Sequence, residues 1–259
     1  MPGFPGGTEP LLLFNAQGRQ LATPLFFMSS ETLHLKERLA EAARYALMRR
    51  LLPAIRHNIA GSLQPIGMMS AMLERRIQSV TPDLAQFVKN TQALTALSRE
   101  AVATSKNLMA WLAPIDNELI AINSAVDESF SLVATELSFR GYSLDNQAAD
   151  SVARLPKGVL RSVFTASLIA LTDMADQPAA IVVTAQNGAG VIQLKITVEP
   201  CALNDPAITA TRISNYRLLQ WDDVQALADV EGVKLEHAPD FVRLDYCTTL
   251  AGKPVSPGR

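Results

Sequence analysis

The stretch from residue 29 to residue 113 carries the pattern of two long helices joined by a short turn, and this feature constrains the fold most. Ser29 or Ser30 offers an N-cap for the first helix. That helix should continue to about residue 78 through Pro53 and Pro65, each of which we expect to bend it. The sequence therefore predicts one long, interrupted helical pattern at the start of the chain.

A second helix start follows at Thr81-Pro82-Asp83. Threonine is a good cap, proline suits the first helical position, and an acidic residue is favourable near the positive end of the helix dipole. We expect this second helix to end before Pro114. Together the two patterns predict an antiparallel helical hairpin over residues 29–113.

Beyond residue 114 short strands alternate with three helices, which indicates an α+β sandwich with helices on one face of a sheet. The expected strands are 118–123, 142–146, 180–186, 191–199, 233–237 and 241–247, and the expected helices are 124–141, 156–175 and 214–231. The predicted domains are therefore an N-terminal extension (1–28) with a β-hairpin within 11–27, the helical hairpin (29–113), the α+β domain (114–250) and a flexible tail (251–259).

Composition excludes several classes of function. The chain has 259 residues, of which 48% are hydrophobic and 19% charged, and its net charge is −2. This balance is typical of a globular protein and gives no attraction for nucleic acid or an anionic membrane. Cys201 and Cys247 are far apart, and with three scattered histidines they make a poor metal site. With no apolar run long enough to span a bilayer, we expect a cytoplasmic protein without a bound metal or cofactor.

His57 is the candidate catalytic residue. At about 100° per residue, Ile55, Ile59, Ile66, Leu73 and Ile77 form one stripe that should be buried against the second helix. His57 lies roughly opposite this stripe, on a face with Pro53, Gly61, Gln64 and Met68. Gly61 follows one turn later and removes side-chain bulk, which suits close approach of a partner. A neutral imidazole there can accept a phosphoryl group, while the plainer alternative is an ordinary solvated histidine.

The segment from Arg56 to Ile66, which reads RHNIAGSLQPI, resembles the phosphoacceptor box of sensor histidine kinases. The position on the first helix of a hairpin also resembles their dimerisation and histidine-phosphotransfer domain. Two departures stand out: Ser62 takes the place of a common proline, and Asn58 takes the place of the acid that assists autophosphorylation. By this resemblance Arg56 would screen phosphate charge and Asn58 would orient the ring.

The later part, roughly 118–250, is similar in layout to the ATP-binding domain of that family, a Bergerat-like α/β sandwich. The resemblance places two phosphate- and magnesium-binding asparagines where this chain has Ala166 and Ala170, and a glycine motif where it reads Glu199-Pro200-Cys201-Ala202-Leu203. No glycine occurs from residue 191 to residue 231. Alanine cannot ligate magnesium through its side chain, and a nucleotide lid needs backbone that adopts positive φ.

The resemblance thus implies a degenerate histidine-kinase core that is similar to dimeric histidine phosphotransferases. In this interpretation the hairpins pair as a four-helix bundle, because Leu84, Phe87, Leu94, Leu97, Val102 and Leu108 do not fit one narrow seam. The expected partners are a second copy of the chain and receiver domains, belonging to response regulators or a hybrid histidine kinase, which would supply the magnesium. Two alternatives stay open: a scaffold that never carries phosphate, and an ATP-dependent kinase with an unusual site.

Overall fold

The computed structural model describes residues 30–78, 83–109, 111, 118–148, 153–175, 177–188, 190–200 and 217–247. The chain divides into two compact units, Met1–Leu35 and Lys36–Arg259. The described part of the first unit is the beginning of the first helix, and all other described elements belong to the second unit. The β-hairpin predicted within 11–27 and the tail predicted at 251–259 lie outside the described residues. The domain boundary at residue 114 stays a prediction.

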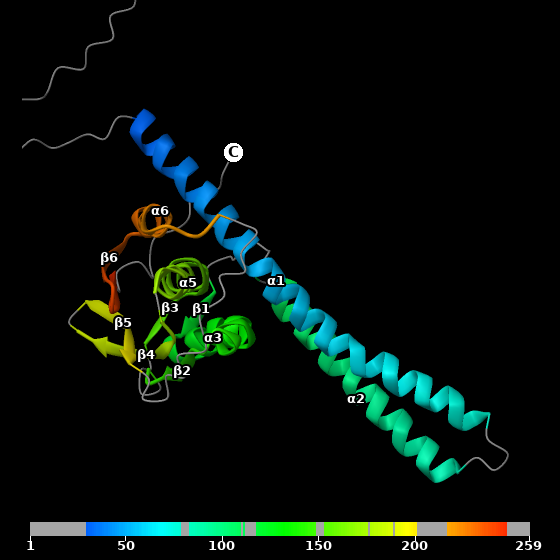
Figure 1. The fold of residues 1–259 in the computed structure, drawn as a ribbon. Coiled ribbons are helices and arrows are strands. Elements are labelled where there is room, and N and C mark those ends of the chain that lie inside the picture. The colour runs from blue at the N-terminus through cyan, green and yellow to red at the C-terminus, as the bar shows by residue number, and fades with distance from the viewer. Residues whose placement is uncertain are drawn as a thin grey trace, which may run out of the picture. The chain divides into compact units, whose positions relative to one another are not determined.

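The helical hairpin is present as predicted. Helix α1 (Ser30–Ile77) runs unbroken through Pro53 and Pro65, and helix α2 (Leu84–Met109) returns beside it (Figure 1). The cap of α2 is Asp83, whose carboxylate oxygen Oδ1 accepts hydrogen bonds from the backbone N–H groups of Ala85 and Gln86 at 3.0 and 3.1 Å. The cap that we assigned to Thr81 is therefore wrong by two residues, because the acid itself satisfies the first free N–H groups.

The remaining described elements form the α+β domain that the strand and helix pattern predicts. A five-stranded mixed sheet has the order β2-β4-β5-β7-β6, in which β2 and β4 are parallel and the other pairs antiparallel, and a separate two-stranded sheet pairs β1 with β3. The strands are β1 (Leu119–Ala121), β2 (Ser143–Asn146), β3 (Arg154–Pro156), β4 (Ala179–Asn187), β5 (Val191–Pro200), β6 (Val233–Ala238) and β7 (Phe241–Cys247). The helices are α3 (Ile122–Phe139), α4 (Lys157–Val159), the π-helical segment η1 (Leu160–Phe164), α5 (Thr165–Met174) and α6 (Trp221–Glu231).

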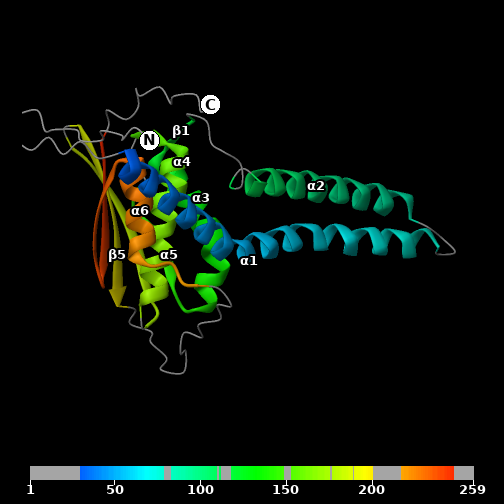
Figure 2. The same cartoon turned by 90° about the horizontal axis from the view of Figure 1, so that it is seen from above.

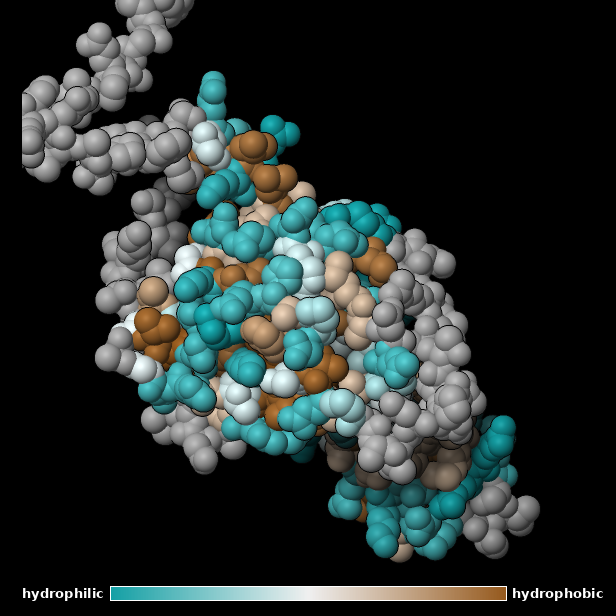
Figure 3. Space-filling view, turned by 60° about the vertical axis from the view of Figure 1, so that its left-hand side comes forward, coloured by the Kyte–Doolittle hydropathy of each residue, from teal (hydrophilic) through white to brown (hydrophobic). Residues whose placement is uncertain are grey.

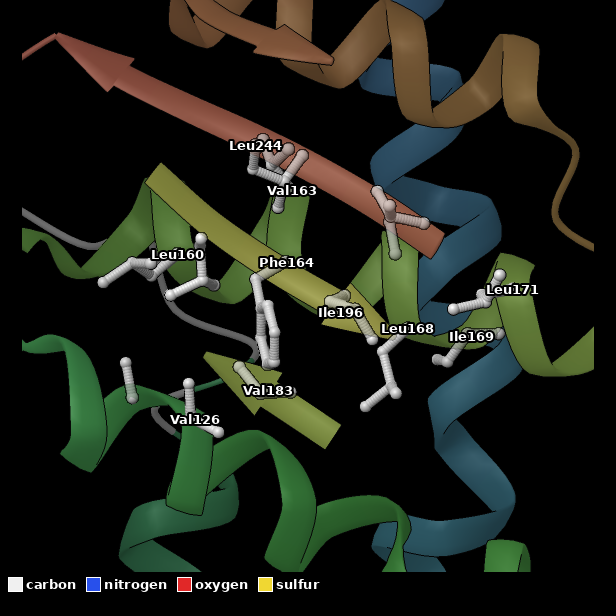
Figure 4. Packing of buried hydrophobic residues seen from close by; sticks show 14 of the residues in the cluster. Val126, Leu160, Val163, Phe164, Leu168, Ile169, Leu171, Val183, Ile196 and Leu244 are labelled. Atoms are coloured by element: carbon white, nitrogen blue, oxygen red, sulfur yellow. The ribbon is translucent and has the colours of Figure 1, made fainter. Parts of the chain in front are cut away.

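Helices cover one face of the large sheet (Figure 2). The continuous helical run from α4 through α5 carries apolar side chains that pack onto the inner residues of the central strands. Figure 4 shows Val163 beside Leu244 of β7, and Phe164 beside Val183 of β4. All of these side chains are fully buried. The hydrophobic core that results also includes residues of both hairpin helices, among them Leu51 and Leu108.

Two helix starts differ from the sequence prediction. Helix α3 begins at Ile122 and has no side-chain cap, so Ser124 lies inside the helix and is not its cap. The free N–H of Ile122 donates instead to the carbonyl of Ala153 at 3.2 Å, a contact that the unpredicted strand β3 makes possible. Helix α6 begins at Trp221, seven residues later than predicted, because the side chains of Gln220 and Asp223 form a reciprocal capping box.

The outer face of the sheet, which the helices do not cover, is the more exposed to solvent. Its side chains alternate with the buried ones and include Lys195 of β5 and Arg243 and Asp245 of β7. In Figure 3 hydrophilic residues are interspersed with smaller hydrophobic patches over the visible face of the molecule. The sheet therefore has one face in the core and one exposed face, as the predicted sandwich requires.

Two buried tyrosines should respond oppositely to loss of their hydroxyl groups. Tyr246 is fully buried, its hydroxyl has no hydrogen-bond partner among the described residues, and burial raises the pKa of this group. The Tyr142 hydroxyl donates to the carbonyl of Thr172 at 3.1 Å. We expect Tyr246→Phe to raise the free energy of unfolding by about 1 kcal/mol and Tyr142→Phe to lower it by a similar amount. Urea denaturation of both variants checks this, and a loss of stability in Tyr246→Phe would contradict it.

Candidate functional site

The predicted buried stripe of α1 is largely confirmed. Ile55 and Leu73 are buried, and Ile59 and Ile66 are half-buried. Ile77, at the end of the helix, is 59% exposed in the single chain. Of the six apolar α2 residues named from the sequence, Leu108 is buried, three are half-buried and two are exposed; the half-buried ones are Phe87, Leu94 and Leu97, and the exposed ones are Leu84 and Val102. One chain therefore buries only part of the apolar surface of its hairpin.

His57 is exposed, as its helical face predicts. Pro53, Gly61, Gln64 and Met68, the other residues of that face, are exposed too. Of its neighbours in sequence, Arg56 is exposed and Asn58 is half-buried. Within the part of the chain that the structure describes, His57 makes no hydrogen bond or ion pair. Both ring nitrogens of His57 can therefore be approached by an external partner.

Gly61 is not required by packing within the chain. A Cβ atom built at this position meets nothing within 4 Å. No close contact within one chain therefore requires glycine at this position. The interpretation that Gly61 makes room for an approaching partner beside His57 stays a prediction.

A largely buried group of charged side chains includes Arg50 of α1, which lies seven residues before His57 and therefore on the same side of the helix. We call Arg50, Glu136, Arg140 and Asp173 the Arg50 cluster. The Arg50 guanidinium donates to both oxygens of Asp173, each at 3.0 Å, and to Glu136 Oε2 at 2.8 Å. Arg140 Nη1 donates to Asp173 Oδ1 at 2.8 Å. The cluster joins α1 to α3 and α5.

The electrostatics of the Arg50 cluster favour its charged form. Burial alone lowers the pKa of Arg50, but the hydrogen bonds and charges of Glu136 and Asp173 outweigh burial and raise it above its usual value. The Asp173 side chain is only 3% exposed, and two guanidinium groups compensate its charge. Arg50 is therefore a permanent cation held in a fixed, forked geometry.

The positions where the resemblance places asparagines lie in the core. Ala166 and Ala170 of α5 are both fully buried. Glu199, the first residue of the segment that stands in place of the family's glycine motif, is exposed near the end of β5, and residues 201–216 lie outside the described part of the chain. Neither alanine position is therefore open to solvent.

The sequence analysis missed the Arg50 cluster. Its four members come from α1, α5 and the end of α3, and only Glu136 and Arg140, four residues apart, are related by their spacing. One signal was present: Asp173 is the one charged residue of α5, and an acid in a helix that covers a sheet needs a partner where it is buried. At the start of α6, Asp223 has a structural role, because it accepts from the backbone N–H of Gln220 at 2.9 Å and pairs with Arg217.

Among the helices that the structure describes, none combines the length and the apolar character that crossing a membrane demands. Within the same described residues, no group of three or more His, Cys, Asp or Glu side chains gathers in a way that could hold a metal ion.

No family model matches the sequence, and no curated protein matches it. Solved structures with a similar trace include the histidine kinase AdeS of Acinetobacter baumannii, with 12% identity and a TM-score of 0.41 over 69% of this chain and 94% of that one. A blue-light activated histidine kinase of Erythrobacter litoralis has 14% identity and a TM-score of 0.41 over 78% and 64%. A bacterial phosphotransferase has 13% identity and a TM-score of 0.36 over 77% and 94%. At these TM-scores the structural likeness is limited, so the proposed function is argued from the residues of this chain.

Proposed function

We propose that this chain is a dimeric histidine phosphotransfer protein of a two-component phosphorelay. His57 takes a phosphoryl group from the aspartyl phosphate of one receiver domain and passes it to the aspartate of another. The observation that carries the proposal is the exposed imidazole on the outer face of a helical hairpin, opposite the stripe that packs on α2. A partner can reach this ring without any rearrangement of the chain.

The chemical step needs only the imidazole and a receiver. A ring nitrogen of neutral His57 attacks phosphorus, the nitrogen–phosphorus bond forms, and the bond from phosphorus to the aspartyl oxygen breaks. The carboxylate leaves with the electron pair, and the second transfer reverses these events on another receiver. The magnesium ion that neutralises the phosphoryl oxygens comes with the receiver. Arg56, exposed beside His57, adds positive charge, and Gln64 lies on the same face.

We propose further that the chain does not use ATP. Ala166 and Ala170 offer no oxygen to magnesium, and both are buried in the core. A residue with a larger polar side chain at either position would have to enter a packed hydrocarbon environment. The absence of glycine from residue 191 to residue 231 supports the same conclusion, since a phosphate-binding lid depends on backbone freedom.

The proposal also includes a homodimer. An exposed apolar stripe on α1 contains Leu52, Leu63 and Ile77, and one on α2 contains Leu84, Val88 and Val102; each of these residues is at least 46% exposed. At about 100° per residue, these exposed apolar residues of α1 lie roughly opposite His57 on their helix. A second hairpin on that side would complete a four-helix bundle and leave both histidines accessible.

A charge placed in this stripe should separate the dimer. We expect Leu63→Glu to give the mass of one chain, 28.0 kDa, in light scattering at micromolar concentration, whereas the unaltered protein gives twice that mass. The reason is that a carboxylate in a helix interface must be desolvated without a partner. Gln64→Glu is the matched control, because it adds the same charge one residue later on the His57 face and should remain dimeric. A monomeric unaltered protein would contradict the proposal.

One observation favours the scaffold alternative. Asn58 stands beside His57 where the resemblance expects an acid, and an amide cannot take up a proton from the ring. A scaffold would bind receivers equally well with and without His57 and would never carry phosphate. An ATP-dependent kinase would instead show magnesium-dependent nucleotide affinity in a simple titration.

The proposed function is tested with candidate receivers that carry labelled phosphate on their aspartate. After mixing, we expect label on this chain that is lost in acid and retained in base, as for phosphohistidine. Label should then pass to a second, unlabelled receiver. Receiver binding with no label on the chain would support the scaffold, and label that is stable in acid would contradict transfer through histidine.

A further inference from the structure

The first half of α1, from Lys36 onward, lies against the helices of the α+β domain. Its buried side chains recur every three or four residues and are at most 5% exposed; they are Ala40, Ala43, Leu47, Leu51 and Ile55. Two ion pairs at the surface connect the same stretch to α6, from Lys36 to Asp229 at 3.2 Å and from Arg44 to Glu231 at 2.6 Å. These exposed pairs contribute little by themselves. The apolar stripe is therefore the main contact.

The Arg50 cluster gives this contact its specificity. Arg50, Arg140 and Asp173 are 11%, 12% and 3% exposed at their side chains, and Glu136 is 30% exposed. A forked guanidinium between two carboxylates fixes both the position and the angle of α1 on the α+β domain, which an apolar stripe cannot do. If α1 moved away, Asp173 would lose one of its two arginines and Arg50 would lose both carboxylates.

Asp173, which binds α1, lies on the same side of α5 as the two alanines. Asp173 follows Ala166 by seven residues and Ala170 by three, so the three side chains lie within roughly 60° of one another around the helix. Asp173 binds Arg50 of α1, which shows where that face points. Small side chains at Ala166 and Ala170 permit close approach of a neighbouring helix, and both are fully buried.

We propose that the face of α5 carrying Ala166, Ala170 and Asp173 is a docking site for α1 of the same chain, with Arg50 as its anchoring residue. The docked helix covers that face and excludes a nucleotide from it. It also fixes the α+β domain at one end of the hairpin, so that His57 stands about 10 Å further along α1.

A second contact supports this inference at the other helix of the hairpin, α2. Trp111, just after α2, lies under the guanidinium of Arg161, whose Cζ atom is 4.9 Å from the ring centroid. Arg161 is 7% exposed and pairs with Glu128 of α3 at 2.8 Å. Cation–π contacts with a desolvated arginine are among the stronger ones. The two contacts together attach both helices of the hairpin to the same domain.

Thiol labelling tests the docking without any phosphoryl donor, so its failure is separate from failure of the proposed function. In the full chain with Cys201 and Cys247 replaced by Ser, a single Ala43→Cys reports on the buried side of α1, and Ala60→Cys reports on an exposed position of the same helix. We expect Ala43→Cys to react with a disulfide reagent at least about 100-fold more slowly than Ala60→Cys. Adding Arg50→Met should raise the Ala43→Cys rate by on the order of 10- to 100-fold.

Three controls separate docking from general stability. Arg44→Ala removes an exposed arginine of the same helix and should leave the rate within about twofold. Ala179→Cys, buried at the start of β4, should stay slow in the Arg50→Met protein because the domain remains folded. If Arg50→Met does not fold, Glu136→Gln should show the same effect at smaller size. Equal rates for Ala43→Cys and Ala60→Cys, no effect of loss of the Arg50 cluster, or equal acceleration of Ala43→Cys and Ala179→Cys would each overturn the proposal.

Discussion

Replacement of His57 by Gln is expected to reduce phosphate uptake from a phosphorylated receiver to less than about one hundredth of the unaltered protein. Glutamine keeps a polar side chain of similar reach on an exposed helical position, so the fold should not change. Its amide nitrogen has no free lone pair to attack phosphorus. The rate is measured from the loss of label on the receiver and its appearance on this chain.

Two comparisons make the His57 result specific. His34→Gln changes another exposed histidine of α1 and should leave the uptake rate unchanged. Receiver binding by His57→Gln, measured by calorimetry, should persist, because the ring is one contact among many in any docking surface. Undiminished uptake of phosphate by His57→Gln would contradict the proposed function, whatever the binding result.

The second large effect is expected for Asp173→Ala. This change leaves Arg50 and Arg140 close together in a buried location with only Glu136 to compensate them. Breaking a buried ion pair by removing one partner costs on the order of 3–5 kcal/mol, and two buried guanidinium groups that share one carboxylate place this variant in that range. Urea denaturation gives the loss in free energy of unfolding.

The control for Asp173→Ala is Glu74→Ala, which removes an exposed acid of α1 and should change stability by no more than about 0.5 kcal/mol. The double variant Arg50→Met with Asp173→Ala should lose less than the sum of the single variants, because the two residues share one interaction. Strict additivity would show that the Arg50 cluster does not act as a unit.

The long helices and the sheet could be predicted because their signals are local. The apolar spacing of α1 predicted its ends to within one residue, and the strand β7 was predicted with its observed bounds. The starts of α3 and α6 were wrong, since the first depends on pairing between β1 and β3 and the second on a capping box formed by glutamine, a less common cap.

The candidate site was predictable only in part. Exposure of His57 followed from helical geometry, which needs nothing beyond the sequence of α1. The contact of Arg50 with Asp173 joins residues 123 positions apart, and no periodicity relates them. The sequence analysis treated Ala166 and Ala170 as a loss of ligands, whereas their burial shows that they also serve packing.

The two edge strands of the five-stranded sheet have a consequence for self-association. Strand β6 forms one margin and carries Lys234 and Glu236 with exposed side chains, while β2 forms the other and is only four residues long. Short strands and charged side chains are the usual protection against extension of a sheet by a foreign strand. Growth of a continuous sheet from copy to copy through main-chain pairing is therefore disfavoured at both edges.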